Sequence, residues 1–351
     1  SVTVVVGSAI VTPNISTDGS ISTAFYKSGE LLDNDRMTKV AITCDDVTAA
    51  LDIYTGELGF RVDSIFPADG PRRATLSGFG IEVELRGPGS TAPVEAVCEP
   101  SLVVTKIGDG GFGTGRAGMQ YRDLVPDRYG GHFIASHIRI PSGGPVPDYV
   151  HHHAIRFQLI FCVNGWVRVV YEDQGEPMLM KAGDCFLQPP HIRHRVLECS
   201  DGMEVVEIAS PAEHETAVDH EMTLPTSTIE PQRDFGGQRF VFSQAEGAKW
   251  QPWACPGFEY RDTGIGAATD GIASAHVVRA LPGVGSADLA HDGAVRFLYV
   301  LTGSAVFDGE STHSLAAGDA CAIPPNVTAM LRDASPDFTM LEVCDPSQTP
   351  G

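Results

Sequence analysis

The feature that most constrains the fold of this chain is an internal repeat in its second two thirds. The stretch "GMQYRD" at residue 118 returns as "GFEYRD" at 257, and "AGD" followed by "PP" at 182–190 returns at 317–325. The closing stretches "VVEIASP" and "MLEVCDP" also correspond, and the offset stays between 135 and 140 residues. Similarity at a fixed period indicates two copies of one structural unit. We therefore predict tandem strand-rich domains at residues 118–210 and 251–346, joined by a polar connector at 211–250.

The composition favours strands over helices in these domains. Of the 351 residues 42% are apolar, and the chain contains 38 Gly and 24 Pro. Glycine and proline at this frequency supply the turns that a chain of many short strands needs. The length also leaves room for more than one hydrophobic core. We expect a mainly β protein with several domains.

The charge of the chain excludes some classes of partner. Lys and Arg number 24 against 45 Asp and Glu, which gives a net charge of −21 and a pI near 4.8. Such a surface repels phosphate backbones and anionic membrane faces, so neither nucleic acid nor a membrane is an expected partner. The eight cysteines are widely spread without a CxxC pair, which predicts reduced thiols in a cytoplasmic protein.

Residues 1–37 precede the first recognisable pattern and have no function that the sequence predicts. Their apolar beginning, "SVTVVVGSAIVT", lacks a basic segment and is shorter than the roughly 20 residues that cross a bilayer. We interpret this beginning as possible extra strands. Met37 stands directly before "TKVAITCDDV" and is a plausible alternative start of the chain.

Residues 38–87 have the pattern of one strand, one helix and three strands. Apolar residues at helical spacing between Val47 and Tyr54 predict the helix, with Asp45 or Asp46 at its N-cap. The following residues 88–117 are rich in Gly and Pro and are predicted to be a linker.

The stretch "VAITCDDVTAALDIYTGELGFRV" resembles one βαβββ module of the glyoxalase, or vicinal oxygen chelate, superfamily. Members of that family usually pair two modules and take a metal ligand, most often a His, from the position that is Lys39 here. Glu84 lies where the last strand of such a module often supplies a carboxylate. Because the position of the His is a Lys, we expect this module to serve packing or dimerisation rather than metal binding.

Three consecutive histidines in "YVHHHAIRFQLIFCVNG", residues 149–165, suggest a metal site in the first repeat. Successive side chains of a strand point to opposite faces, so His151 and His153 are expected on one face and His152 on the other. Downstream, "AGDCFLQPPHIRHRVLE" at 182–198 contains a Gly-Asp turn, a strand that ends at two prolines, and His194 at the start of the next strand.

Together these stretches resemble the paired motifs of the cupin superfamily, whose fold is a double-stranded β-helix or jelly-roll barrel. The resemblance covers residues 118–346 and makes His151, His153 and His194 metal ligands. The position of the usual Glu ligand is Gln158. Gly165, Gly183 and Pro189 match the glycines and the proline of the motifs. Two further positions depart from the motifs: His191 replaces a glycine, and Gly144 lies one residue too far upstream.

Three imidazoles from neighbouring strands suit one divalent transition metal, with Fe(II) preferred and Zn, Ni, Mn or Cu as alternatives. Gln158 offers only a neutral amide oxygen, so the metal keeps its full charge and favours an anionic, bidentate small-molecule substrate. Gln158 is expected either to ligate the metal or to hydrogen-bond to substrate or water. Arg156 and Glu198 are further candidates for substrate contact or catalysis.

The second repeat lacks most of these ligands. Counting back from Gly303 places Leu289, His291 and Arg296 opposite His151, His153 and Gln158. Aligning "AVRF" with "AIRF" places His291 opposite His151 instead. His194 is matched by Ala329. In both registers one His of three remains, so we predict no metal in the second barrel.

These features predict an enzyme of the bicupin kind, a mononuclear non-haem iron dioxygenase that uses O₂ and a small chelating hydroxy, keto or carboxylate substrate. Two alternatives remain open: a non-oxidative lyase, isomerase or hydrolase that uses Zn, Ni or Mn, and a binding protein without turnover. The single βαβββ module would leave a sheet edge and an apolar face exposed. We therefore predict a homodimer through this module, unless residues 1–36 cover it.

Overall fold

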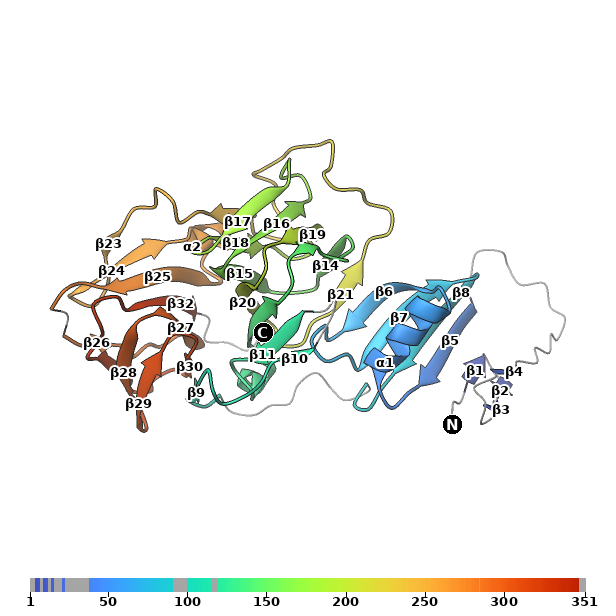
Figure 1. Cartoon of the computed structure of the whole chain (residues 1–351), viewed down its shortest axis with the longest axis horizontal. Helices are drawn as coiled ribbons and strands as arrows, with labels where there is room; N and C mark the ends of the chain where they lie inside the picture. The colour runs from blue at the N-terminus through green and yellow to red at the C-terminus, as the bar shows by residue number, and fades with distance from the viewer. Residues whose placement is uncertain are drawn as a thin grey trace. The chain divides into compact units, whose positions relative to one another are not determined.

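The structure, a computed structural model, describes residues 38–90, 100–114, 119–283 and 285–346, together with the backbone of four short strands before residue 38. The chain forms two compact units. The N-terminal unit comprises Ser1–Pro93 with His214–His220, and the barrel unit comprises Val94–Glu213 with Glu221–Gly351. Figure 1 shows the first unit in blue and the second in green to red, apart from the short β21 segment of the first. Among the described residues, no helix is long and apolar enough to cross a membrane.

The N-terminal unit contains the predicted order of one strand, one helix and three strands (Figure 1). Its sheet has the order β21-β6-β7-β8-β5-β1-β2, in which β5 and β8 are parallel and the other pairs antiparallel. The bounds are β1 Val4–Val6, β2 Ala9–Val11, β5 Thr38–Thr43, α1 Val47–Asp52, a π-helical turn Ile53–Glu57, β6 Arg61–Phe66, β7 Arg73–Gly78, β8 Ile81–Arg86 and β21 Thr216–Val218. A separate hairpin joins β3 Asn14–Ile15 and β4 Ile21–Ser22.

Helix α1 covers one face of this sheet. It begins after Asp46, whose carboxylate accepts a hydrogen bond from the backbone N–H of Ala49 at 3.0 Å. Val47 and Leu51 lie one turn apart and pack with buried residues of the sheet, among them Leu76. The apolar spacing in the sequence therefore corresponds to the face that the helix buries.

The other face of the sheet is polar, contrary to the apolar face predicted from sequence. Lys39 forms an ion pair with Glu82 at 2.9 Å, and Arg86 forms one with Glu84 at 2.6 Å. The hydrogen bond from Arg86 lowers the pKa of Glu84. Lys39 and Glu84, the two positions at which the resemblance places metal ligands, are thus engaged with opposite charges.

Both edges of this sheet are also covered by other strands of the chain, which corrects the expectation of an exposed edge. Strand β1 pairs with β5, and β21, which comes from the connector, pairs with β6. The apolar N-terminal stretch and three residues of the connector supply backbone partners that the five-element pattern by itself lacks. The homodimer stays a prediction.

The first barrel consists of two facing sheets. One sheet has the order β10-β11-β12-β20-β15-β18-β22, and the other contains β17-β16-β19-β14, with β13 also paired to β19. The bounds are β10 Gly113–Thr114, β11 Gln120–Asp123, β12 Ile134–Ile140, β13 Gly144–Pro145, β14 His151–His153, β15 Phe157–Asn164, β16 Trp166–Tyr171, β17 Met178–Lys181, β18 Cys185–Gln188, β19 His194–Cys199, β20 Met203–Ser210 and β22 Val241–Ser243, with a 3-10 turn at Arg128–Gly131.

The second barrel repeats this architecture, as predicted. Its sheets have the orders β23-β24-β25-β32-β27-β30-β9 and β26-β31-β28-β29. The bounds are β9 Val103–Thr105, β23 Gln251–Pro252, β24 Phe258–Asp262, α2 Ile265–Ala268, β25 Ser274–Ala280, β26 Ala287–Asp288, β27 Val295–Thr302, β28 Ser304–Asp308, β29 Thr312–Ala316, β30 Ala320–Ile323, β31 Met330–Arg332 and β32 Thr339–Asp345.

The two barrels exchange their outermost strands. Strand β9 precedes the first barrel in the chain but pairs with β30 of the second, while β22 precedes the second barrel and pairs with β18 of the first. The segment predicted as a linker at 88–117 is therefore in part a strand. Its apolar "VVT" has the composition of an edge strand, but the surrounding Gly and Pro hide this in the sequence.

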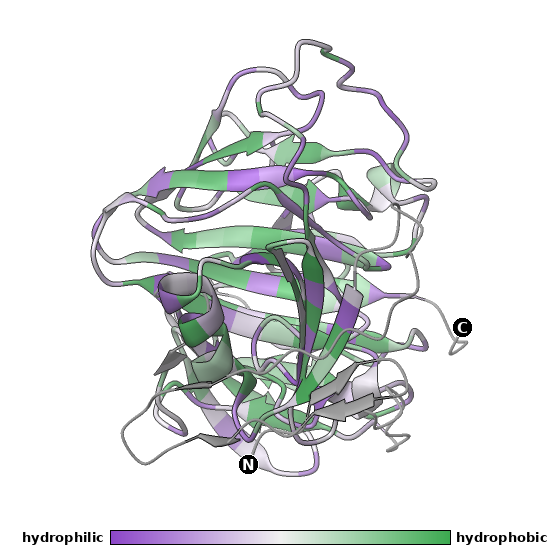
Figure 2. Cartoon of the chain, turned by 90° about the vertical axis from the view of Figure 1, so that its right-hand side faces the viewer, coloured by the Kyte–Doolittle hydropathy of each residue, from purple (hydrophilic) through white to green (hydrophobic). Residues whose placement is uncertain are grey.

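Three large apolar clusters organise the barrel unit, beside a small one that contains Ile134 and Ile155. One fills the first barrel, a second fills the second barrel, and the third lies between the two seven-stranded sheets. Alternate residues of β15 take part in different clusters: Phe157, Leu159 and Phe161 face the second barrel, and Cys162 faces the interior of the first. Figure 2 shows hydrophobic and hydrophilic segments following one another along the strands of the chain. The seven described cysteines form no disulfide.

Candidate metal centre

Strands β14 and β19 bring the three predicted ligands together. His151 and His194 are directly opposite each other in the antiparallel pair of these strands. His151 and His153 are buried on the same face, while His152 between them is only partly buried, as alternation along a strand requires.

The three imidazoles converge on one point inside the first barrel. One ring nitrogen of each of His151, His153 and His194 lies within 4.8 Å of the others. The ring centroids of His151 and His194 are 4.3 Å apart, and His153 lies 5.1 and 5.2 Å from these two. First-row metals bind imidazole nitrogen at about 2.1 Å, so small side-chain movements would place all three nitrogens around one ion.

Backbone carbonyl groups fix the orientation of two of the rings. Nδ1 of His151 lies 2.8 Å from the carbonyl oxygen of Tyr149, and Nδ1 of His194 lies 3.0 Å from that of Ile192. A carbonyl oxygen only accepts, so each Nδ1 carries the proton and each Nε2 presents its lone pair. This is the tautomer that a metal ligand needs, and carbonyl partners of this kind hold ligating histidines in place.

The wall beside His194 is aromatic and neutral. The ring of Tyr171 stacks on that of His194 with centroids 5.5 Å apart. The phenol oxygen of Tyr171 accepts a hydrogen bond from Nε2 of Gln188 at 2.9 Å, and burial raises the pKa of this phenol. Tyr171 therefore stays protonated at neutral pH and adds no charge to the site.

Gln158 lies on the inner face of β15, and one of its two amide atoms is already engaged in a hydrogen bond. Its Nε2 donates to a carboxylate oxygen of Glu207 at 2.5 Å. Its Oε1 is buried and has no hydrogen-bond partner among the described residues. A buried acceptor without a partner is costly, so this oxygen is available to a metal, a water or a substrate. Both roles predicted for Gln158 remain open.

Glu207 is a residue of the site that the cupin-like motifs of the sequence do not include. It lies on β20, on the inner face, opposite Ser136 of β12 and Ile160 of β15. The repeat contains a signal for it, because "VVEIASP" and "MLEVCDP" share their glutamate, but only the hydrogen bond to Gln158 connects this glutamate with the site.

The two further candidates from the sequence have structural partners. Arg156 forms a two-pronged ion pair with Asp345 at the end of the second barrel, with Nη2 and Oδ1 3.0 Å apart. Glu198 accepts from Nε of Arg168 at 2.7 Å on a partly exposed surface. A catalytic role for Arg156 or Glu198 stays a prediction.

The remaining histidines of this region lie outside the triad. His191 is exposed in a turn with a φ of 61°, and its Nδ1 lies 3.3 Å from Nδ1 of His152. The strand alternation and the motif spacing in the sequence likewise leave both residues out of the ligand set.

The second barrel shows which register relates the two copies. The backbone N–H of Leu289 donates to the carbonyl of Ala329, whereas His151 pairs with His194, so Leu289 corresponds to His151. Arg296 is opposite Ile323 and Cys344 where Gln158 is opposite Gln188 and Ala209. The register counted from Gly303 is therefore the right one. The first barrel's triad is the one metal-like cluster among the described residues.

An ion pair occupies the place of the Gln158–Glu207 contact in the second barrel. Nε of Arg296 lies 3.3 Å from one carboxylate oxygen of Glu342, the counterpart of Glu207. The other oxygen of Glu342 lies 3.2 Å from Nδ1 of His276 and accepts from Nε1 of Trp253 at 3.3 Å. A cation at this position disfavours a bound metal.

Comparisons with known proteins bear on the fold. No family model and no curated protein matches the sequence. Solved structures do match. The protein Ylba from E. coli matches with a TM-score of 0.52 and 11% identity, over 74% of this chain and 97% of that one. A protein described as glyoxylate-induced, from Pseudomonas aeruginosa, matches with a TM-score of 0.54 and 14% identity, over 74% of this chain and 94% of that one. Oxalate decarboxylase from Lactobacillus farciminis, solved with formate, also matches, with a TM-score of 0.52 and 15% identity over 72% of this chain and 88% of that one.

The two barrels have the cupin fold. At these identities the likeness supports the architecture that the paired motifs predict, and it carries no substrate or reaction to this chain. The resemblance of residues 38–87 to the glyoxalase superfamily stays a prediction. The donor set itself fits a divalent metal, because three buried imidazoles, two of them with tautomers fixed by backbone carbonyl groups, lie in one barrel with a buried amide oxygen that has no hydrogen-bond partner among the described residues.

Proposed function

We propose that this protein is a metal-dependent enzyme that acts on a small anionic substrate in the first barrel, and that the metal is Fe(II) in a dioxygenase. The observation that carries the proposal is the buried triad of His151, His153 and His194, which brings one ring nitrogen of each residue within 4.8 Å of the others. Fe(II) is one of the ions that imidazole ligands suit, and it supplies the one-electron chemistry that O₂ needs.

The protein's own part is to hold the donors and keep the site dry. The triad is at most 8% exposed, and Tyr171 with its neighbours closes the side next to His194. Burial strengthens every electrostatic interaction in the barrel and keeps the neutral phenol from competing as a ligand. The hydrogen bond from Gln158 to Glu207 aims the free amide oxygen of Gln158 away from that carboxylate.

The substrate class follows from charge. Three imidazoles and an amide contribute no negative charge as donors, so a divalent ion held by them keeps both of its positive charges within the donor set, and the carboxylates of Glu207 and Asp148 lie behind Gln158 and His151. An anion that carries two oxygen donors, such as a carboxylate next to a hydroxyl or keto group, neutralises this charge best. The cleaved bond would be a carbon–carbon bond, with both oxygen atoms of O₂ entering the products.

A non-oxidative lyase is the second candidate, and one observation favours it. Glu207 places a carboxylate beside Gln158 on the inner face of the barrel, where it could exchange a proton with a substrate. Oxalate decarboxylase is also among the solved structures with this fold. In this case a Lewis-acidic metal suffices and no O₂ is consumed.

The test is metal analysis of protein purified without added metal, followed by parallel O₂-electrode and CO₂-release assays on a panel of hydroxy and keto acids. The dioxygenase predicts Fe and O₂ uptake in proportion to substrate lost. CO₂ release without O₂ uptake, abolished in Glu207→Gln but retained in Glu198→Gln, would support the lyase. Binding without consumption of any acid, in metal-loaded protein, would contradict both.

For assembly, we propose a homodimer formed through the N-terminal unit. With both edges of its sheet paired internally, the contact would use exposed apolar residues at one end of the unit, namely Ile53, Leu58 and Phe79, of which Phe79 is 78% exposed. Light scattering should give twice the 37.3 kDa chain mass. Phe79→Ser should return the mass to that of one chain, whereas a wild-type monomer at high concentration would refute the dimer.

A further inference from the structure

The repeat places two equivalent arginines between the barrels, and their surroundings differ. Arg122 follows "GMQY" in the first copy and Arg261 follows "GFEY" in the second. Nη2 of Arg122 donates to the carbonyl of Gly318 at 2.6 Å, and Nη2 of Arg261 donates to the carbonyl of Gly183 at 2.6 Å. The two guanidinium groups thus make the same contact across the interface, each with the other barrel.

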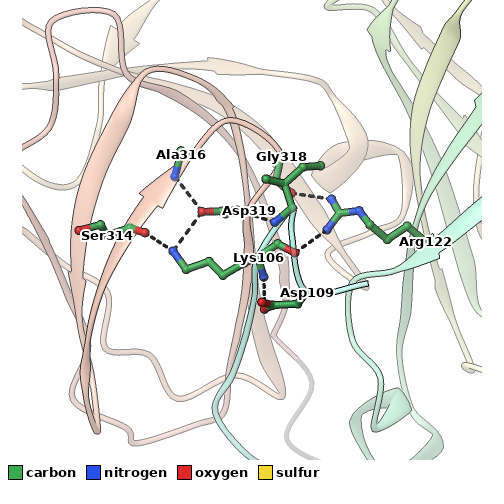
Figure 3. Close-up of polar contacts among 8 residues, drawn as sticks. Lys106, Asp109, Arg122, Ser314, Ala316, Gly318 and Asp319 are labelled. Carbon is green, nitrogen blue, oxygen red and sulfur yellow. Dashed lines mark hydrogen bonds and ion pairs between the residues drawn. The ribbon is translucent and has the colours of Figure 1, made fainter. Parts of the chain in front are cut away.

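Arg122 has further partners, of which Figure 3 shows the carbonyl group of Lys106. Its Nη1 donates to the carbonyl of Lys106 at 3.2 Å, and Nη2 lies 3.3 Å from Nδ1 of His137. Lys106 in turn forms an ion pair with Asp319 at 3.0 Å and donates to the carbonyl of Ser314. These contacts hold the segment around Lys106, which precedes the first barrel in the chain, next to Arg122.

Side chains fill the rest of the space around Arg122. The ring of His137 contacts those of Phe112 and Tyr299, with centroids 5.2 and 5.8 Å away. The side chain of Ile107 reaches so close to Gly318 that a Cβ on that glycine would lie 2.8 Å from its Cδ1. This side of the interface is therefore closed by large residues.

Smaller or differently shaped residues stand at the equivalent positions around Arg261. The strand registers match Ile107 with Ala245, His137 with Val277 and Tyr299 with Phe161. The result is a cavity of about 330 Å³, a volume within the usual range of small-molecule sites. Its lining combines Trp250, Phe161, Val277 and Leu301 with polar groups of Arg261 and Arg279.

The charge of this cavity is positive and incompletely balanced. Arg261 is 3% exposed, and its Nη1 has no hydrogen-bond partner among the described residues. Burial lowers the pKa of Arg261. No Asp or Glu belongs to the lining, although Arg279 stacks on Trp250 and forms an ion pair with Glu259 at 2.9 Å.

Asp184, whose carboxylate acts electrostatically on Arg261, already has other partners. The two oxygens of Asp184 accept hydrogen bonds from the backbone N–H groups of Lys181 and Ala245, at 3.0 and 2.7 Å. Where Glu204 accompanies His137 in the closed counterpart, the cavity has Thr339. A buried guanidinium with an unused donor and no adjacent free carboxylate favours an anion from outside.

We propose that this cavity between the barrels binds a small organic carboxylate with an apolar or aromatic body, at a site separate from the metal centre. The carboxylate accepts from Arg261 and takes the place of the Lys106 carbonyl and the His137 ring of the closed counterpart. The body of the ligand lies against Trp250, Phe161 and Leu301, which are the apolar side chains of the lining.

The experiment is a titration of the full-length protein with benzoate, followed by calorimetry and by the tryptophan fluorescence that Trp250 contributes, with benzamide as the neutral isostere. We expect benzoate to bind one to one and benzamide at least about tenfold more weakly, because both offer an acceptor oxygen but only the carboxylate brings the negative charge that a buried guanidinium favours. The affinity should be unchanged in His151→Ala/His194→Ala, which separates this site from the metal centre and from the proposed function.

The matched variant is Ala245→Ile/Val277→His, which copies the closed counterpart into the open one. It should lose benzoate binding by about tenfold or more while its thermal unfolding and metal content stay near wild type. Arg261→Gln, checked for folding by the same melt, should lose binding as well.

Three outcomes would overturn the proposal: no binding of benzoate at about 10 mM to folded wild-type protein, equal affinity for benzamide, or full affinity in the filled variant. If the filled variant does not fold, Ala245→Ile by itself decides, because residue 245 lies beside Gly183 as Ile107 lies beside Gly318.

Discussion

The two barrels are built on one plan and differ at the centre. In the first, His151 and His194 face each other across two strands, and a neutral amide at Gln158 contacts a glutamate. In the second, the same places are occupied by Leu289 and Ala329, and an arginine contacts the equivalent glutamate, Glu342.

This difference shows that the fold does not require the ligands. Leu289 and Ala329 are 0% and 1% exposed and belong to the second barrel's core, so apolar packing replaces the histidines there without loss of architecture. Histidines in the interior of the first barrel carry a desolvation cost that leucine does not. Their joint presence at fixed spacing therefore points to chemistry rather than to folding.

The largest expected effect is loss of the metal from the first barrel. His151→Ala/His194→Ala should reduce bound metal from one equivalent per chain to almost none, because a single remaining imidazole does not hold a divalent ion. His291→Ala is the matched control in the second barrel and should leave metal content unchanged, as measured by elemental analysis. Full metal content in the double variant would refute the centre.

Exchanging the central residue of the two barrels should have the next largest effect. Gln158→Arg places the second barrel's cation beside the triad and should weaken metal affinity by about a hundredfold, or about 3 kcal/mol. Gln158→Met removes the amide without adding charge. Near-normal affinity in Gln158→Met would show that Gln158 does not ligate, while equal losses in both variants would make it a ligand. Competition with a chelator measures both.

Removing the ion pair of the second barrel should lower the free energy of unfolding and leave the metal content of the first barrel unchanged. Arg296→Leu leaves the carboxylate of Glu342, whose side chain is 3% exposed, without its cation, and should cost about 3 kcal/mol in urea unfolding. Arg296→Leu/Glu342→Leu should recover much of this loss. Arg168→Leu, which breaks a pair with both side chains 39% exposed, should cost less than about 1 kcal/mol.

The smallest effect concerns pH and the interface between the barrels. Burial lowers the pKa of His137, so below the ordinary value of 6.5 the unfolded chain binds a proton that folded His137 does not. Stability should therefore fall as the pH decreases from about 7 to 5, even though Glu204 faces this ring and opposes the shift. His137→Val, which copies Val277, should flatten this part of the melting-temperature profile. An unchanged profile would contradict the assignment.

The sequence by itself determined the architecture of the barrels and the three histidines that meet inside the first of them. The repeat "YRD … AGD … PP" indicates two strand-rich copies. Gly, Asp and Pro favour turns because of their own backbone and side-chain properties, so turn positions can be recognised from single residues. The alternation in "HHH" likewise places His151 and His153 on one face. Helix α1 followed from its apolar spacing and from an N-cap at Asp45 or Asp46, of which the structure has Asp46.

Only the tertiary structure decided which residues meet across strands and between domains. Strand β9 pairs with β30, a strand of the barrel at the far end of the chain, and the contact of Gln158 with Glu207 joins residues 49 positions apart. The pattern of neighbouring residues in the sequence does not indicate which distant strands and side chains pair. The cavity at Arg261 depends on the same kind of information, because Ala245 and Val277 stand where the larger Ile107 and His137 pack in the other half of the repeat.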